Sequence, residues 1–153
     1  RRANDKERAA DILIFLVAAH DTTAYSMAYI MMHITKHNPK ELSIFRQKAS
    51  SLHSTTITNI DELQWMIREG LRLSPVAALG VVRILGKEWN HNNMIQIPNK
   101  AITIIPFLSN FRNPNYYELP DEYIPSRLLT STSSLSPYSN GIRNCIGQPI
   151  AKM

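Results

Sequence analysis

The longest stretch of the chain without a helix-breaking residue predicts a long first helix. Residues 3–37 contain neither Pro nor Gly, and they include a continuous apolar run at 12–19. A segment with this composition predicts a single helix. Because it is apolar on nearly every side, we expect this helix to be buried.

Two shorter helices are predicted downstream. The second covers residues 39–49, where a proline suits the first helical turn. A Ser- and Thr-rich linker at 50–58 separates it from the third helix, which begins near residue 59 and ends before Pro75. The apolar stripe of the third helix recurs every three to four residues and consists of Leu63, Met66, Ile67 and Leu71.

Beyond Pro75 the pattern changes to short runs that are rich in β-branched residues. These runs lie at 81–85, 94–97 and 101–105, with turn residues at 90–93 and 98–100, and they predict strands of one small sheet. Residues 113–135 predict coil with at most a short helix, and a last helix follows residue 147. The expected fold class is mainly α with a small β-sheet.

The composition is that of a globular protein with a modest positive charge. The chain has 153 residues, of which 44% are hydrophobic, and its formal net charge is +5. Basic residues concentrate at positions 1–8, but Asp5 and Glu7 interrupt them, so we expect a solvated helix end and no nucleic-acid partner. The apolar run at 12–19 is shorter than the roughly 20 residues that cross a bilayer, so no transmembrane segment is expected.

Cys145 is the only cysteine, which excludes an internal disulfide and a multi-cysteine zinc site. An inert core thiol, a catalytic nucleophile and a single metal ligand remain possible. A Cys–His hydrolase lacks support, because nothing in the sequence orients a histidine toward Cys145. The histidines show no metal-ligand spacing, and we expect them to be solvated or at helix ends: His20, His33, His37, His53 and His91.

The residues around Cys145 decide among these possibilities. Positions 137–147 read PYSNGIRNCIG, which resembles the heme-binding loop of the cytochrome P-450 family of heme-thiolate monooxygenases. The resemblance implies that Cys145 ligates the iron of heme b (iron protoporphyrin IX) as a thiolate turned toward the ring. It also implies cofactor contacts from an aromatic residue, two glycines that let the backbone approach the ring, and a cation for a heme carboxylate: Tyr138, Gly141, Gly147 and Arg143.

A second pattern lies in the long helix, where positions 18–23 read AAHDTT. The hydroxyl of Thr22 can bond the Ala18 carbonyl four residues earlier and loosen the helix into a groove. Taken alone, this pattern fits a back-bonded threonine in a buried helix. It resembles the oxygen-activation segment of the family's long distal helix, which implies that Asp21 and Thr22 help deliver protons to dioxygen. The family commonly has Gly where this chain has Ala19.

Three further residues gain meaning only from the resemblance. Glu69 and Arg72 are three positions apart on one helix face, and a lone pair of this kind is weak evidence. The family's version recruits a second arginine from a downstream Pro-x-Arg, here Arg127, and the three are then expected to form a structural triad behind the cysteine loop. A charge in an apolar strand is costly without a partner, and the resemblance supplies a heme propionate as the partner of Arg83.

Four motifs in the family's order imply the C-terminal portion of the cytochrome P-450 fold: long distal helix, Glu-x-x-Arg helix, small sheet and cysteine heme loop. Residues 1–153 would then form a partial heme-thiolate monooxygenase domain, without the N-terminal half and the extreme C-terminus. The resemblance implies that the whole enzyme activates dioxygen and inserts one oxygen atom into an apolar small molecule. Its electrons would come from a reductase, an NADPH-dependent flavoprotein.

The resemblance also implies the endoplasmic reticulum membrane, with an anchor that lies outside this chain. We expect the 153 residues alone to hold heme weakly and to be inactive. One alternative is a truncated or degenerate heme-binding relative without turnover. A heme-thiolate isomerase or dehydratase is less well supported, because Asp21 and Thr22 are both present.

Overall fold

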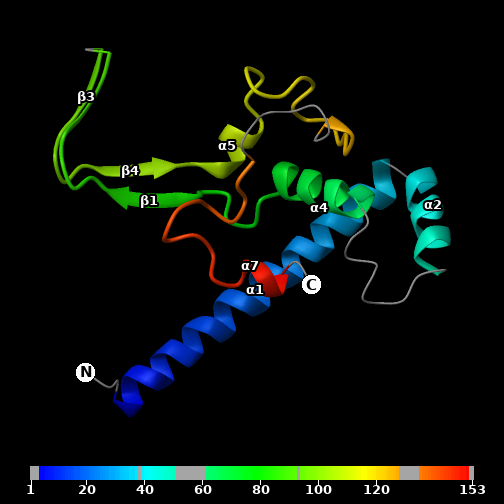
Figure 1. Cartoon of the computed structure of the whole chain (residues 1–153), viewed down its shortest axis with the longest axis horizontal. Coiled ribbons are helices and arrows are strands. Elements are labelled where there is room, and N and C mark those ends of the chain that lie inside the picture. The colour runs from blue at the N-terminus through cyan, green and yellow to red at the C-terminus, as the bar shows by residue number, and fades with distance from the viewer. Residues whose placement is uncertain (1–3, 38, 51–60, 93, 128–134, 152–153) are drawn as a thin grey trace.

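The described residues form helices and two small antiparallel sheets (Figure 1). This confirms the expected fold class, mainly α with a small amount of β-structure. The structure is a computed structural model and describes residues 4–37, 39–50, 61–92, 94–127 and 135–151. In chain order the elements are α1 (Asp5–His37), α2 (Pro39–Ser50), α4 (Asp61–Leu73), β1 (Val81–Ile84), β2 (Trp89–His91), β3 (Ile95–Ile97), β4 (Ile102–Ile105), α5 (Phe107–Phe111) and α7 (Gln148–Ala151).

Helix α1 runs unbroken over 33 residues, as its sequence predicts. A reciprocal pair of hydrogen bonds fixes its beginning. The Glu7 backbone N–H donates to Asn4 Oδ1 at 2.9 Å, and the Asn4 N–H donates to Glu7 Oε2 at 2.8 Å. This capping box satisfies two of the N–H groups that have no partner inside the helix.

The expectation that α1 is buried is wrong for most of its length. Among the described residues of α1, only His33 and Ile34 are buried, and the apolar side chains at 12–17 are 55–64% exposed. Figure 1 shows the N-terminal half of α1 extending away from the other elements. The apolar pattern of a helix indicates which of its residues could be buried, but actual burial depends on which segments pack against them. Here α4 and α2 pack against α1.

The C-terminal half of α1 packs closely against α4. A Cβ atom added at Gly70 would lie 2.8 Å from Ile30 Cγ1, so a side chain at this position would push the two helices apart. Together with a residue beyond α5, the two helices form the first hydrophobic cluster, which contains Ile34, Met66, Leu73 and Tyr123, with Ile30 and Leu42 packed against it.

The β-rich region forms two two-stranded sheets where one sheet was expected. Strands β1 and β4 pair antiparallel in the register Val81↔Ile105, and β2 and β3 pair in the register Trp89↔Ile97. Strand β2 occupies part of the expected turn at 90–93, because Trp89 finds a cross-strand partner and the reversal contracts to the residues around Asn92 (φ 50°). The predicted turn at 98–100 is confirmed by a hydrogen bond from the Ala101 N–H to the Pro98 carbonyl at 3.2 Å.

A second hydrophobic cluster lies at the base of the β1–β4 sheet. Phe107, Phe111 and Leu135 are buried together, and Val81 packs against them. The short helix α5 supplies the two phenylalanines and was not predicted as a separate element. The cluster attaches the β1–β4 sheet to the chain segment that precedes the cysteine loop.

A buried carboxylate joins α4 to the coil after α5. Glu69 and Arg72 have no exposed side-chain surface, and Glu69 accepts two hydrogen bonds of 2.9 Å from the Arg72 guanidinium. Arg127 Nε donates to Glu69 Oε1 at 2.9 Å, and the backbone N–H of Ile124 donates to the same oxygen at 3.0 Å. We call Glu69, Arg72 and Arg127 the Glu69 triad; the structure brings these three side chains together as the sequence motif implies.

Arg72 uses all five of its N–H donors. Beyond its two bonds to Glu69, it donates to three backbone carbonyls of the coil, those of Phe111, Pro120 and Glu122, over 2.7–3.0 Å. Its guanidinium also lies 5.0 Å from the centre of the Tyr117 ring. Arg72 therefore holds residues 111–122 in place, although this segment has almost no regular structure.

We expect Glu69→Gln to lower the free energy of unfolding by about 3–5 kcal/mol, because it leaves buried arginine charge without its counter-charge. The exposed Glu88→Gln is the matched control and should change stability by no more than about 0.5 kcal/mol. Denaturant unfolding of both variants checks the prediction. Equal stability of the two variants would contradict it.

Candidate functional site

The loop around Cys145 is shaped by short-range backbone hydrogen bonds. The Cys145 N–H donates to the Tyr138 carbonyl at 2.9 Å, and the Asn144 N–H donates to the Gly141 carbonyl at 3.1 Å. Gly141 has φ of +83°, a left-handed conformation that glycine adopts without strain. The loop then passes into α7, whose first N–H, that of Gln148, donates to the Cys145 carbonyl at 3.2 Å.

The Cys145 thiol is exposed in this chain. The sequence resemblance implies that it faces a heme ring as a thiolate. An added Cβ at Gly141 would meet no atom within 4 Å, and one at Gly147 would lie 3.8 Å from Cys145 Sγ, an ordinary contact distance. Open space therefore lies beside Gly141, and the thiol is accessible. A thiolate that can be approached from outside is a strong, soft metal ligand.

Tyr138 lies beside Cys145 on the same loop. Burial raises the pKa of the Tyr138 phenol above its ordinary value, and the charge of the Cys145 thiolate raises it further. The phenol is therefore neutral at physiological pH. Tyr138 as a whole is half-buried.

The two arginines predicted to pair with heme carboxylates are both exposed. Arg83 Nη1 donates to the Val82 carbonyl at 3.0 Å. The expectation that Arg83 lies in a covered apolar strand is wrong. Val82 and Ile84 on either side of it are 55% and 70% exposed. Water solvates the Arg83 charge in this chain, so its charge alone does not require a partner. Arg143, on the cysteine loop, is likewise accessible.

The polar segment of α1 has the expected hydrogen bond. Thr22 Oγ1 donates to the Ala18 carbonyl at 2.5 Å, and α1 stays helical through this point. His20 Nδ1 lies 2.9 Å from Asp21 Oδ1. All four residues are exposed, so the Asp21 carboxylate and the Thr22 oxygen can be reached from outside.

The described histidines are either exposed or buried. His20, His37 and His91 are exposed as expected, and His53 lies outside the described residues. For His33 the expectation is wrong, because the ring is 8% exposed and Nε2 lies 2.9 Å from Ser74 Oγ. The sequence signal was its position between Ile30 and Ile34 on the apolar face of α1.

The described residues hold no group of three or more His, Cys, Asp or Glu side chains that is suited to a metal ion. Within the same residues, no helix combines the length and hydropathy needed to cross a membrane.

Comparison with known proteins places the chain in a family. The family model described as cytochrome P450 matches residues 1–153. Cytochrome P450 3A25 of Mus musculus is 28% identical over 97% of this chain, and lithocholate 6-beta-hydroxylase of Mesocricetus auratus is 29% identical over 97%. Cytochrome P450 monooxygenase orf5 of Eupenicillium brefeldianum is 28% identical over 94%.

In each of these three comparisons, the chain spans 31% of the relative's length. The match of the family model covers residues 1–153 of this chain, which include the polar segment of α1 and the cysteine loop. The chain belongs to the cytochrome P450 family.

Proposed function

We propose that this chain forms the heme-ligating portion of a monooxygenase. The whole protein would insert one oxygen atom of dioxygen into an apolar organic substrate, with electrons from a flavoprotein reductase that oxidises NADPH. The observation that carries the proposal is the family match over residues 1–153 together with Cys145 in a loop of the family's heme-binding pattern.

The chemistry of the loop fits a heme. Cys145 offers an accessible thiol, the space beside Gly141 is open, and Tyr138 lies half-buried on the same loop. Cys145 would bind the iron, with Gly141, Gly147 and Tyr138 beside the ring. Arg143 and Arg83 would pair with its carboxylates through exposed guanidinium groups. A heme bound through a thiolate supplies oxygen activation, because the thiolate donates electron density to the iron.

Asp21 and Thr22 would handle protons. The Thr22 hydroxyl hydrogen is directed to the Ala18 carbonyl, so its oxygen presents lone pairs that accept a hydrogen bond. The Asp21 carboxylate is close to the His20 ring and accessible, so it can exchange a proton with water. A hydroxyl and an acid on adjacent residues can therefore hold and pass a proton at one point of α1.

The Glu69 triad would act by positioning. Arg72 and Arg127 fix residues 111–127, which lead into the segment that carries Cys145. Its proposed part is to hold the segment that leads to the cysteine loop against α4. Glu69 is the counter-charge that both arginines share, and backbone carbonyls accept their further hydrogen bonds.

Substrate, partner and location follow from the family alone. The hamster relative is named for hydroxylation of lithocholate, and we propose only the broader class of apolar small molecules for this chain. The net charge of +5 is compatible with an acidic electron donor. By family resemblance, the proposed location of the whole protein is the endoplasmic reticulum membrane.

Cys145→Ser should abolish thiolate ligation of heme. The reduced whole protein exposed to carbon monoxide should show a strongly red-shifted Soret band, and this band should disappear in the variant. Asn144→Ala changes the exposed neighbouring side chain and should retain the band. A band that persists in Cys145→Ser would contradict the assignment. A band without oxidation of any apolar substrate would favour a heme-binding relative that does not turn over.

Thr22→Ala should separate oxygen activation from heme binding. We expect the heme spectrum to remain unchanged, peroxide release to rise, and substrate oxidation to fall on the order of 10²-fold. Thr35→Ala is the matched control, because Thr35 Oγ1 makes the same kind of bond in α1, to the Met31 carbonyl at 2.8 Å. Product and peroxide formed per electron donor consumed are the measurements. A variant with undiminished turnover would point to an isomerase or dehydratase.

A further inference from the structure

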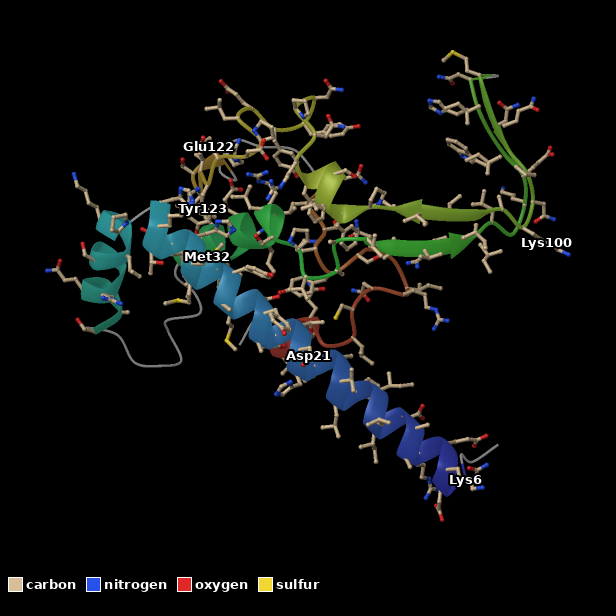
Figure 2. The ribbon with its side chains drawn as sticks, turned by 180° about the vertical axis from the view of Figure 1, so that it is seen from behind. Lys6, Asp21, Met32, Lys100, Glu122 and Tyr123 are labelled. Atoms are coloured by element: carbon tan, nitrogen blue, oxygen red, sulfur yellow. The ribbon has the colours of Figure 1, made fainter. Side chains whose placement is uncertain are left out.

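His33 lies at the point where α1 meets both α4 and the coil after α5. Its Nε2 is 2.9 Å from Ser74 Oγ, immediately after the end of α4. Its ring stacks on Tyr123 with centroids 5.5 Å apart and planes inclined by 8°. Tyr123 is itself fixed, because its hydroxyl donates to the Met66 carbonyl at 3.0 Å. Figure 2 shows Tyr123 beside the C-terminal turns of α1.

The hydrogen bonding of His33 accommodates a neutral ring. His33 Nδ1 and Arg112 Nε are both buried, and neither has a hydrogen-bond partner among the residues that the structure describes. A second ring proton would make both nitrogens donors, and the N–H at Nδ1 would then be buried without an acceptor. A buried donor without a partner is unfavourable, so the hydrogen bonding opposes protonation.

The charges around His33 also oppose protonation. Lys36 and His37 face it from α1, and Arg112 faces it from the segment after α5, held there by a 2.7 Å bond from Nη2 to the Leu73 carbonyl. Glu69 on α4 favours protonation, but its carboxylate already binds two arginines. Tyr123 carries no charge while its hydroxyl is bonded to the Met66 carbonyl.

We propose that the contact formed by His33, Ser74 and Tyr123, the His33 junction, is pH-sensitive: it joins α1 to α4 while His33 is neutral and opens when His33 takes up a second proton. Helix α1, which would move away, carries the Asp21 segment, and α4 carries Glu69 and Arg72. The junction is independent of the proposed function, since it needs no cofactor or substrate.

The direction of the effect follows from linkage. Burial is the largest cause that lowers the pKa of His33 below its ordinary value of 6.5, followed by the positive charges of His37, Arg112 and Lys36, while Glu69 raises it. The opened state therefore binds more protons than the closed state between the lowered pKa and 6.5. The junction is fully stable above that window and loses stability as the pH falls through it.

Hydrogen exchange of the whole protein between pH 7.5 and pH 5.0 tests this proposal. After correction for intrinsic exchange, protection of residues 31–37 should fall as the pH is lowered, by up to about tenfold per pH unit inside the window. His33→Phe keeps a ring against Tyr123 and cannot be protonated, so its protection should not depend on pH. His91→Asn alters an exposed histidine in β2, outside the junction, and should behave like the unmodified protein.

A second variant covers the possibility that His33→Phe does not fold. His33→Gln keeps an amide donor for Ser74 and carries no charge, and it should show the same loss of pH dependence. The proposal is overturned if protection of residues 31–37 is constant over the range, or if both His33 variants retain the original pH dependence.

Discussion

The rest of the structure depends on one buried carboxylate. A charged group with no exposed surface is tolerated only when it is paired and fully hydrogen-bonded. Glu69 meets this condition through Arg72, Arg127 and the backbone of Ile124. Because Arg72 has more donors than Glu69 can accept, its remaining N–H groups draw in the carbonyls of residues 111–122. Satisfying one acid therefore sets the course of a long coil.

Helix α4 is consequently the element to which the other parts attach. The coil attaches through the Glu69 triad, and α1 attaches where Gly70 allows Ile30 to approach and where His33 meets Ser74. Apolar packing in the first hydrophobic cluster adds non-directional stability around these polar contacts. Of the residues proposed for chemistry on α1 and on the cysteine loop, Asp21, Thr22 and Cys145 are exposed, and Tyr138 is half-buried.

Membership of the cytochrome P450 family gives this division a chemical sense. If the proposed function holds, the site for a large flat cofactor needs accessible ligands on a rigid support; the buried contacts of α4 would supply the support and the exposed cysteine loop the access. The relatives are about 28% identical, yet the family model matches every residue of the chain. The chain spans about a third of the length of these relatives.

The local sequence pattern determined the long helices, most of the strands and the family. The absence of Pro and Gly predicted α1, the stripe from Leu63 to Leu71 predicted α4, and the spacing of Gly141, Arg143 and Cys145 indicated the family, because each depends on residues close in sequence. Tertiary structure alone decided that α1 and the strand around Arg83 are exposed, that Trp89 begins an extra strand, and that His33 is buried against Ser74. Burial and strand pairing depend on segments that are distant in the chain, and no local pattern specifies which of these segments will pack against a given residue.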